Sequence, residues 1–314
     1  MALDEATTAL LRAAQNSEAV PFHSLSPVEA RRQTSARGAL AAPGPELEET
    51  RDLLLSVAPD AEIRMRIHKP SLTPRSVVLY LHGGGWVLGG LDSHDSMARN
   101  LAKSSGATIV MAEYRKAPEH PFPVPVDDSW AAFEWMVENR EVVAAPEAAM
   151  YVAGDSAGGN LAAVVAHRSR DTGVGKLAGQ ILIYPVVDHD LTRPSYLAPE
   201  NQTLLPVEAM EYFWGHYLQD PFGRSHPEAS PLKREDLSGL PPALIITAEH
   251  DVLRDEGEHY ARALSAAGVD VELHRWQGQM HGFIQMVGIL PASLEVTELI
   301  ASRISENEKV ESEA

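Results

Sequence analysis

Short apolar runs separated by longer amphipathic stretches dominate the chain from residue 48 onward. Five of the runs are continuous and rich in β-branched residues, a pattern typical of strands buried on both faces of a parallel sheet. Sequence with helical character separates most of them. The pattern therefore predicts an α/β fold, with a mostly parallel central sheet flanked by helices. The five runs lie at 76–84, 107–115, 149–156, 179–188 and 242–251.

The runs at the two ends of this series differ in character. Residues 49–57 and 61–70 alternate between polar and apolar positions, which predicts a pair of strands with one face buried. A last strand is expected at 269–276, after a helix that Gly268 ends. The final helix is expected to run from about residue 292 to residue 306, and the charged tail at 307–314 is expected to fray.

Two segments stand outside the alternation of strands and helices. Residues 1–45 have helical character, and a capping box at Ser26-Pro27-Val28-Glu29 opens a helix to about Ala41. The insertion at 191–230 carries aromatic residues at helical spacing. This helix either packs onto the core or forms a lid over a substrate pocket. We expect both segments to form a helical cap on a core made of residues 46–190 and 231–306.

Composition narrows the function. The formal net charge of −18 makes nucleic acid and anionic membranes poor partners. The chain has no cysteine, which removes disulfides, thiol nucleophiles and thiolate metal sites. No run approaches the roughly 18 apolar residues of a membrane span, and the N-terminus lacks the basic region of a signal peptide. We therefore expect a cytoplasmic protein without metal or cofactor.

One serine stands out by its surroundings. Ser156 lies between Gly154 and Gly158, directly after an apolar run and before a helical segment. A strand–turn–helix of this kind strains its central residue, and glycines two positions away on either side leave room for the turn. The strain aims the hydroxyl outward at the start of a helix, which makes Ser156 a candidate nucleophile.

A nucleophilic serine needs a base and an acid that orients the base, and in this architecture they follow in the order serine, acid, histidine. Asp251 ends a predicted strand and is the expected acid, whereas Asp255 and Glu256 belong to the next helix. Of the 13 histidines, His281 alone follows that acid in a glycine-containing loop, and it is the expected base.

Backbone donors for an oxyanion are also expected. His82 is followed by Gly83, Gly84 and Gly85, whose N–H groups can approach a substrate oxygen closely. Gly84 and Gly85 are favoured within that run, and the N–H of Ala157 would complete the oxyanion hole. Residues expected to line the substrate pocket are Trp86, Asp155, Tyr184 and Trp214.

Five motifs in this order, HGGGW, YRKAPEHPFP, GDSAGGN, DVLRDEG and HGF, resemble the hormone-sensitive-lipase family of carboxylesterases. The resemblance covers roughly residues 60–281 and implies an α/β-hydrolase fold, with Ser156, Asp251 and His281 as the catalytic triad. The chain departs from the family pattern at Lys116, where leucine is usual, and at Val252, where proline is frequent. The resemblance also implies a possible homodimer through the strand at 269–276.

The expected activity is hydrolysis of short- to medium-chain carboxylic esters through an acyl-enzyme. A lactonase, an amidase or a deacetylase would use the same side chains, and the sequence does not separate these reactions. A receptor for small molecules on the same fold is the rival from another class. Such a receptor is expected to have lost a triad member, and this chain retains all three.

Overall fold

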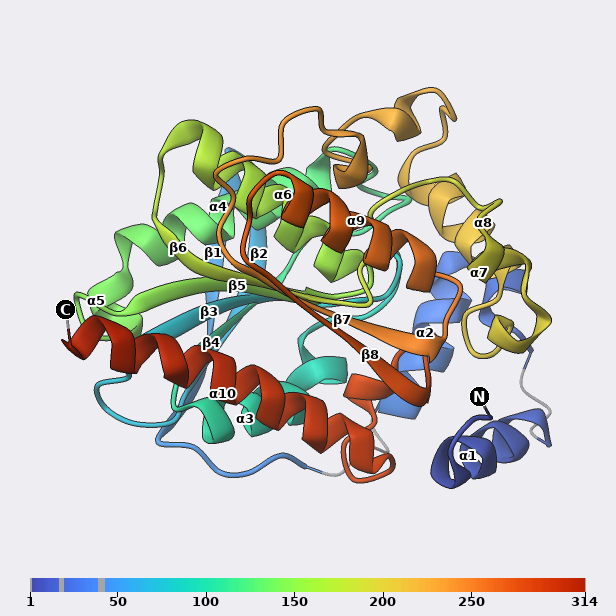
Figure 1. Cartoon of the computed structure of the whole chain (residues 1–314), viewed down its shortest axis with the longest axis horizontal. Coiled ribbons are helices and arrows are strands. Elements are labelled where there is room, and N and C mark those ends of the chain that lie inside the picture. Colours follow the sequence, from blue (N-terminus) through green and yellow to red (C-terminus); the bar gives the residue numbers. More distant parts are fainter. Residues whose placement is uncertain (1, 17–19, 39–42, 314) are drawn as a thin grey trace.

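The computed structural model describes residues 2–16, 20–38 and 43–313. Its centre is a twisted eight-stranded sheet with the order β1-β2-β4-β3-β5-β6-β7-β8 (Figure 1). The strands are β1 (Glu49–Ala58), β2 (Ala61–Lys69), β3 (Ser76–Leu81), β4 (Thr108–Glu113), β5 (Ala149–Asp155), β6 (Leu177–Ile183), β7 (Ala243–His250) and β8 (Val271–Met280).

Six strands, β3 to β8, run parallel, and the first five of them correspond to the five continuous apolar runs. Every residue of β3, β5 and β7 is buried, because helices cover both faces of the sheet. The strand pair expected from the alternating runs is also present. β1 pairs with β2, and β2 pairs with β4, in both cases antiparallel.

Helices cover the two faces of the sheet in separate layers (Figure 1). α3 and α10 pack on one face, and α4, α6 and α9 pack on the other. Each layer encloses its own cluster of buried apolar side chains. The helices of the layers are α3 (Leu91–Ser105), α4 (Val124–Glu138), the short α5 (Arg140–Val143), α6 (Ala157–Thr172), α9 (Arg254–Ala266) and α10 (Pro291–Glu313).

A third group of helices lies at one end of the sheet (Figure 1). It combines α1 (Glu5–Gln15) and α2 (Pro27–Gly38) with α7 (Pro194–Leu197) and α8 (Val207–Tyr217) from the insertion. The 3₁₀ turn η1 (Phe22–Ser24) contacts both α2 and α8, so the N-terminal segment and the insertion meet. We call these elements the cap.

The capping box at the start of α2 is confirmed. The backbone N–H of Ser26 donates to the Glu29 carboxylate at 3.2 Å, and the backbone N–H of Glu29 donates to the Ser26 hydroxyl at 3.4 Å. The expected helix end at Ala41 lies outside the described residues.

Two predicted boundaries are wrong. β8 continues to Met280 instead of ending at residue 276, because Gly278 takes a positive φ of 68° and the strand resumes its pairing after an irregularity. α10 continues to Glu313 instead of ending at about residue 306, and the fraying expected of residues 307–314 stays a prediction. The tail contains no glycine or proline and is rich in glutamate, so the sequence has no signal that stops the helix.

Candidate active site

Ser156 occupies the turn between β5 and α6 with φ 56° and ψ −120°. A Cβ atom on Gly154 would lie 2.3 Å from the Gly158 carbonyl oxygen, and one on Gly158 would lie 1.9 Å from the Leu81 carbonyl oxygen. Any side chain at either position would therefore collide with backbone. The two glycines allow the turn, and the turn presents the Ser156 hydroxyl at the end of the sheet.

The structure brings Ser156, Asp251 and His281 together, although they lie on three different elements. The Nε2 atom of His281 is 3.0 Å from the Ser156 hydroxyl, and its Nδ1 atom is 2.8 Å from the Asp251 carboxylate. Because a carboxylate can only accept, Nδ1 carries the proton and Nε2 is free to accept the serine hydrogen. This is the geometry that a proton relay requires.

The strand ends and their neighbours hold this arrangement in place. Asp251 follows β7 directly, and its second carboxylate oxygen accepts the backbone N–H of Leu253 at 2.9 Å. His281 follows β8 directly. The Tyr184 ring packs against the imidazole of His281, with 4.5 Å between ring centroids. Tyr184 is fully buried. This residue was expected to line the substrate pocket, and in the structure its ring supports the imidazole of His281.

The glycine run separates into two roles. The N–H of Gly83 donates to the Asp155 carboxylate at 2.9 Å, so the expectation that Gly83 serves an oxyanion is wrong. Gly84 and Gly85 have positive φ angles of 116° and 60°. Their N–H groups, and that of Ala157 at the first position of α6, have no acceptor in the described part of the chain. These three donors remain available to an oxyanion.

Asp155 does not line a substrate pocket, contrary to expectation. Its side chain is fully buried and accepts hydrogen bonds from the Tyr80 hydroxyl at 3.0 Å and the Gln285 amide at 2.7 Å, besides that from Gly83. Burial opposes its ionisation, but His94 and the bonds from Gln285 and Tyr80 outweigh burial and hold the pKa of Asp155 at about 2. Asp155 thus fixes the glycine loop next to the serine.

His82 also holds the glycine loop. Its Nδ1 atom is 2.8 Å from the Gly83 carbonyl oxygen, and its ring stacks on Tyr114 at 4.3 Å between centroids. Burial, together with Lys116 and His94, lowers the pKa of His82 well below its usual value. The neutral ring therefore donates a hydrogen bond from Nδ1 to the Gly83 carbonyl oxygen, and this bond holds the glycine loop in place.

Trp86 and Trp214 were expected to line the pocket, but both side chains have an exposed fraction of 0%. The Trp86 ring stacks on Tyr217 at 3.9 Å between centroids and also contacts Trp214. These rings join α8 to the glycine loop, because large aromatic side chains bury most area where two elements meet. Their role is packing between cap and core.

Phe213 on α8 is a residue that the pattern of motifs did not single out for the site. A Cβ atom on Gly85 would lie 2.2 Å from the Phe213 ring, so this ring lies directly on the glycine loop. Phe22 of η1 stacks on Phe213 at 5.4 Å between centroids. The spacing of aromatic residues in the insertion includes Phe213 but does not distinguish it from the other rings there. The contact between Phe213 and Gly85 depends on how the cap packs on the core, which the sequence pattern does not show.

No group of three or more His, Asp or Glu side chains within residues 2–16, 20–38 and 43–313 could hold a metal ion. In the same segments, no helix combines the length and the apolar character needed to cross a membrane.

Comparison with known proteins places the chain in a family. Residues 78–285 match the family described as the alpha/beta hydrolase fold. A carboxylesterase of Mycobacterium tuberculosis is 43% identical over 75% of this chain and 76% of its own length. The chain belongs to the hormone-sensitive-lipase family of α/β hydrolases.

Further relatives of this α/β hydrolase cover nearly the whole chain. An ethyl acetate hydrolase of Pseudomonas putida is 35% identical over 92% of both chains. The solved structure of a hyperthermophilic esterase from Pyrobaculum calidifontis superposes with a TM-score of 0.91, at 36% identity, over 98% of this chain and 99% of that chain. The cap segments thus lie within the region of similarity.

Proposed function

We propose that this α/β hydrolase cleaves short- to medium-chain carboxylic esters with Ser156 as the nucleophile. The observation that carries the proposal is the position of His281, whose two ring nitrogens lie within hydrogen-bond distance of the Ser156 hydroxyl and the Asp251 carboxylate. The names of its relatives, among them a carboxylesterase and an ethyl acetate hydrolase, support an ester as the substrate.

The reaction proceeds in two halves. His281 Nε2 takes the hydroxyl proton as the Ser156 oxygen attacks the ester carbonyl carbon, and the resulting imidazolium gives this proton to the departing alcohol. The acyl group remains on Ser156. In the second half, His281 takes a proton from water, the hydroxide attacks the acyl-enzyme, and the proton returns to Ser156 as the carboxylic acid leaves. Asp251 stabilises the imidazolium in both halves.

The negative charge that forms on the carbonyl oxygen needs donors that are in place beforehand. We assign this role to the N–H groups of Gly84, Gly85 and Ala157. They carry no other hydrogen bond in the described segments, and Ala157 lies at the N-terminal, positive end of α6. Donors fixed in this way cost no reorganisation during the reaction.

Turnover of p-nitrophenyl butyrate and of the matched butyryl p-nitroanilide tests the proposal. The wild-type protein is expected to hydrolyse the ester much faster than the anilide. Ser156→Ala is expected to lower kcat on the order of 10⁶-fold, as losing a triad nucleophile does elsewhere. Unchanged ester turnover in Ser156→Ala would overturn the assignment, and preferential cleavage of the anilide would replace the esterase with an amidase.

We also propose that two copies of the chain pair through β8. This strand is an edge of the sheet, paired with β7 on one side in the described structure, and it exposes 40% of Leu273. An open edge of this kind is a template for pairing with another strand. Light scattering is expected to report a dimer that Leu273→Lys weakens, whereas a wild-type monomer would refute the proposal.

A further inference from the structure

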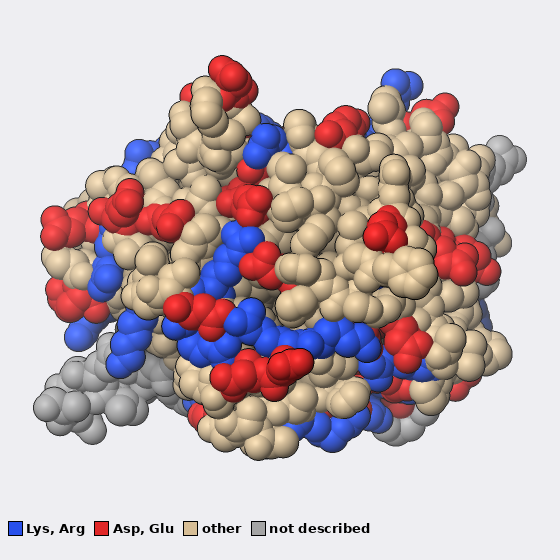
Figure 2. Space-filling model, turned by 90° about the horizontal axis from the view of Figure 1, so that it is seen from above, with Lys and Arg blue, Asp and Glu red and all other residues tan. Residues whose placement is uncertain are grey.

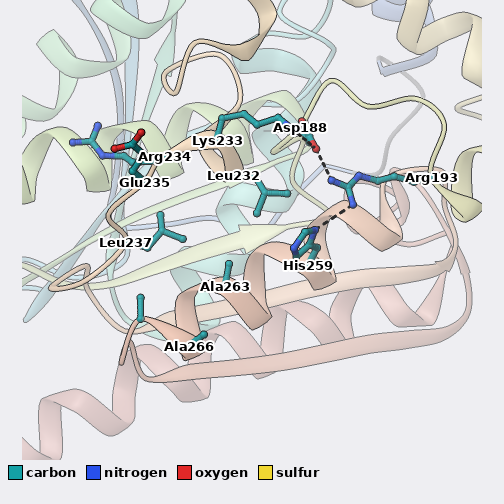
Figure 3. Close-up of a pocket in the computed structure, with 11 residues that line it drawn as sticks. Asp188, Arg193, Leu232, Lys233, Arg234, Glu235, Leu237, His259, Ala263 and Ala266 are labelled. Atoms are coloured by element: carbon teal, nitrogen blue, oxygen red, sulfur yellow. Dashed lines mark hydrogen bonds and ion pairs between the residues drawn. The ribbon is translucent and has the colours of Figure 1, made fainter.

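One cavity of the described structure lies away from the catalytic residues. It has a volume of about 420 Å³ and lies between α9 and the segment that contains the 3₁₀ turn η4 (Pro231–Lys233). None of Ser156, Asp251 and His281 lines it (Figure 3). A cavity of this size holds a small organic molecule.

Charged side chains gather at one end of this cavity around Asp188, whose carboxylate is fully buried. Arg193 donates to one oxygen of Asp188, and the Lys233 ammonium lies 3.1 Å from the other. Two cations thus share a single carboxylate. Arg234 and Glu235 lie together at the other end of the cavity, away from this cluster (Figure 3). The Asp190 carboxylate also interacts with both Arg193 and Lys233, so two cations and two carboxylates meet at the Asp188 end.

A histidine adds a further donor to the cluster. The guanidinium of Arg193 lies 3.2 Å from His259 Nδ1. Because a guanidinium can only donate, Nδ1 accepts and the ring proton sits on Nε2. Partial burial, Arg193 and Arg262 all lower the pKa of His259, which keeps this ring neutral. Arg193 also keeps a buried Nε–H without a partner among the described residues.

The rest of the cavity is apolar. Leu237, Ala263 and Ala266 line it, so the small side chains of α9 leave room for a hydrocarbon group (Figure 3). Figure 2 shows the molecule from above, where Lys and Arg side chains form a band between acidic ones.

We propose that this cavity binds a small amphiphilic anion, with its carboxylate or phosphate head at Arg193, Lys233 and His259 and a short apolar chain against α9. The head group accepts the buried Nε–H of Arg193, which has no partner among the described residues, and its charge pairs with the Lys233 ammonium. A carboxylate would pair with Lys233 without disturbing the bond between Arg193 and Asp188. The proposal does not depend on the reaction at Ser156.

Isothermal titration calorimetry with hexanoate, hexyl phosphate and 1-hexanol tests this site. Lys233→Gln removes one cation, and Ala266→Glu places a carboxylate in the cavity wall. The matched controls are Lys176→Gln and Ser265→Glu, which make the same changes at exposed residues outside the cavity. Melting curves identify any variant that has not folded.

At least one of the two anions is expected to bind the wild-type protein, and its Kd is expected to rise at least tenfold in Lys233→Gln and Ala266→Glu while the controls keep the wild-type value. The tighter of hexanoate and hexyl phosphate identifies the head group. Equal Kd values in all four variants would place any binding elsewhere and overturn the proposal. Binding of hexanol as tight as that of the anions, or no binding of either anion, would overturn it as well.

Discussion

The backbone at Ser156 explains how one hydroxyl among many is aimed at a histidine. A positive φ on a residue with a side chain costs on the order of 1–3 kcal/mol, and the surrounding structure must supply this free energy. The N–H of Ser156 donates to the Ile183 carbonyl at 2.9 Å, and its carbonyl accepts from Asn160 at 3.1 Å. These two bonds fix the residue between β6 and α6.

Gly84 offers the sharpest test of the oxyanion donors. A Cβ atom there would lie 2.4 Å from the Leu88 carbonyl oxygen, and φ is 116°. Gly84→Ala must therefore displace the loop and its N–H group. We predict a loss in kcat of about 10²–10³-fold, the effect of losing one oxyanion donor. Steady-state kinetics on p-nitrophenyl butyrate measures this effect.

Gly106 provides the matched control. It ends α3 with a φ of 71°, but a Cβ atom there has no neighbour within 4 Å. Gly106→Ala is expected to strain its own backbone and to lower stability by about 1–2 kcal/mol, with kcat unchanged. If both substitutions reduced kcat equally, backbone strain in general would account for the loss, and the role of Gly84 would be wrong.

The sequence indicated the three side chains that the structure brings together, because each stands at a position that a known pattern marks. Ser156 follows a strand between two glycines, and Asp251 and His281 come after later strands in the expected order. No sequence pattern shows that the N–H of Gly83 already donates to the Asp155 carboxylate. That bond depends on Tyr80 and Gln285, which meet the same carboxylate from distant parts of the chain.

Among the elements, α8 is the one whose side chain lies against Gly85 of the glycine loop. Its Phe213 ring lies on Gly85, and Phe22 of η1 stacks on that ring from the other part of the cap. Phe213→Ala would remove this ring and open space next to Gly85. We compare kcat/KM for a decanoyl ester with kcat/KM for a butyryl ester, and we predict that this ratio rises at least about tenfold in the variant. Accommodating one or two more methylenes in an apolar site changes kcat/KM by about that factor.

Tyr212→Ala is the control for this prediction, because Tyr212 is the neighbouring aromatic residue and is only partly buried. It is expected to leave the chain-length ratio unchanged. Phe213→Ala also removes a large buried side chain, which typically costs about 3–5 kcal/mol of stability, so the kinetics belong well below the melting temperature. An unchanged ratio in Phe213→Ala would remove this residue from the substrate site.

The elements were easier to predict than their ends and their docking. Strands β3 to β7 are continuous apolar runs, so their positions follow from the pattern. The pattern of apolar residues does not show the irregularity at Gly278 that lengthens β8. The aromatic residues of 191–230 indicated a helix, but whether Trp214 packs or lines a pocket depends on contacts with Trp86, far away in the sequence.

At the scale of the whole molecule, one ion pair fastens the cap to the core. Arg31 of α2 donates to both carboxylate oxygens of Glu119, at 2.7 Å and 2.6 Å, and to the carbonyl oxygens of Val87 and Ala117. The hydrogen bonds from Arg31 lower the pKa of Glu119 from 4.5 to about 2. The pair joins the N-terminal part of the cap to the loop that follows β4, and the bond to Val87 joins it to the loop that follows the glycines.

The sign of the resulting pH dependence follows from these values. Because the pKa of Glu119 is lower in the folded state, its stabilisation is fully present above about pH 4.5 and is lost as the pH falls toward 2. Both side chains are partly exposed, so the contribution is about 1 kcal/mol or less. We predict that Glu119→Gln lowers the free energy of unfolding at pH 7 by this amount.

Urea unfolding at pH 7 and pH 3.5 measures the effect, and the gap between the variant and the wild type is expected to narrow at the lower pH. Glu147→Gln changes an exposed carboxylate elsewhere on the surface and serves as the control. A gap that stays constant with pH would show that the charge of Glu119 does not stabilise the fold.

Covalent labelling tests the central claim most directly. Diethyl p-nitrophenyl phosphate reacts with a serine that a neighbouring base activates, and digestion followed by mass spectrometry locates the diethylphosphoryl group. We predict one label per chain, on the peptide that contains Ser156, and strongly slowed labelling in His281→Ala. Label on any other peptide, or an unlabelled protein, would contradict a nucleophile at Ser156 activated by His281.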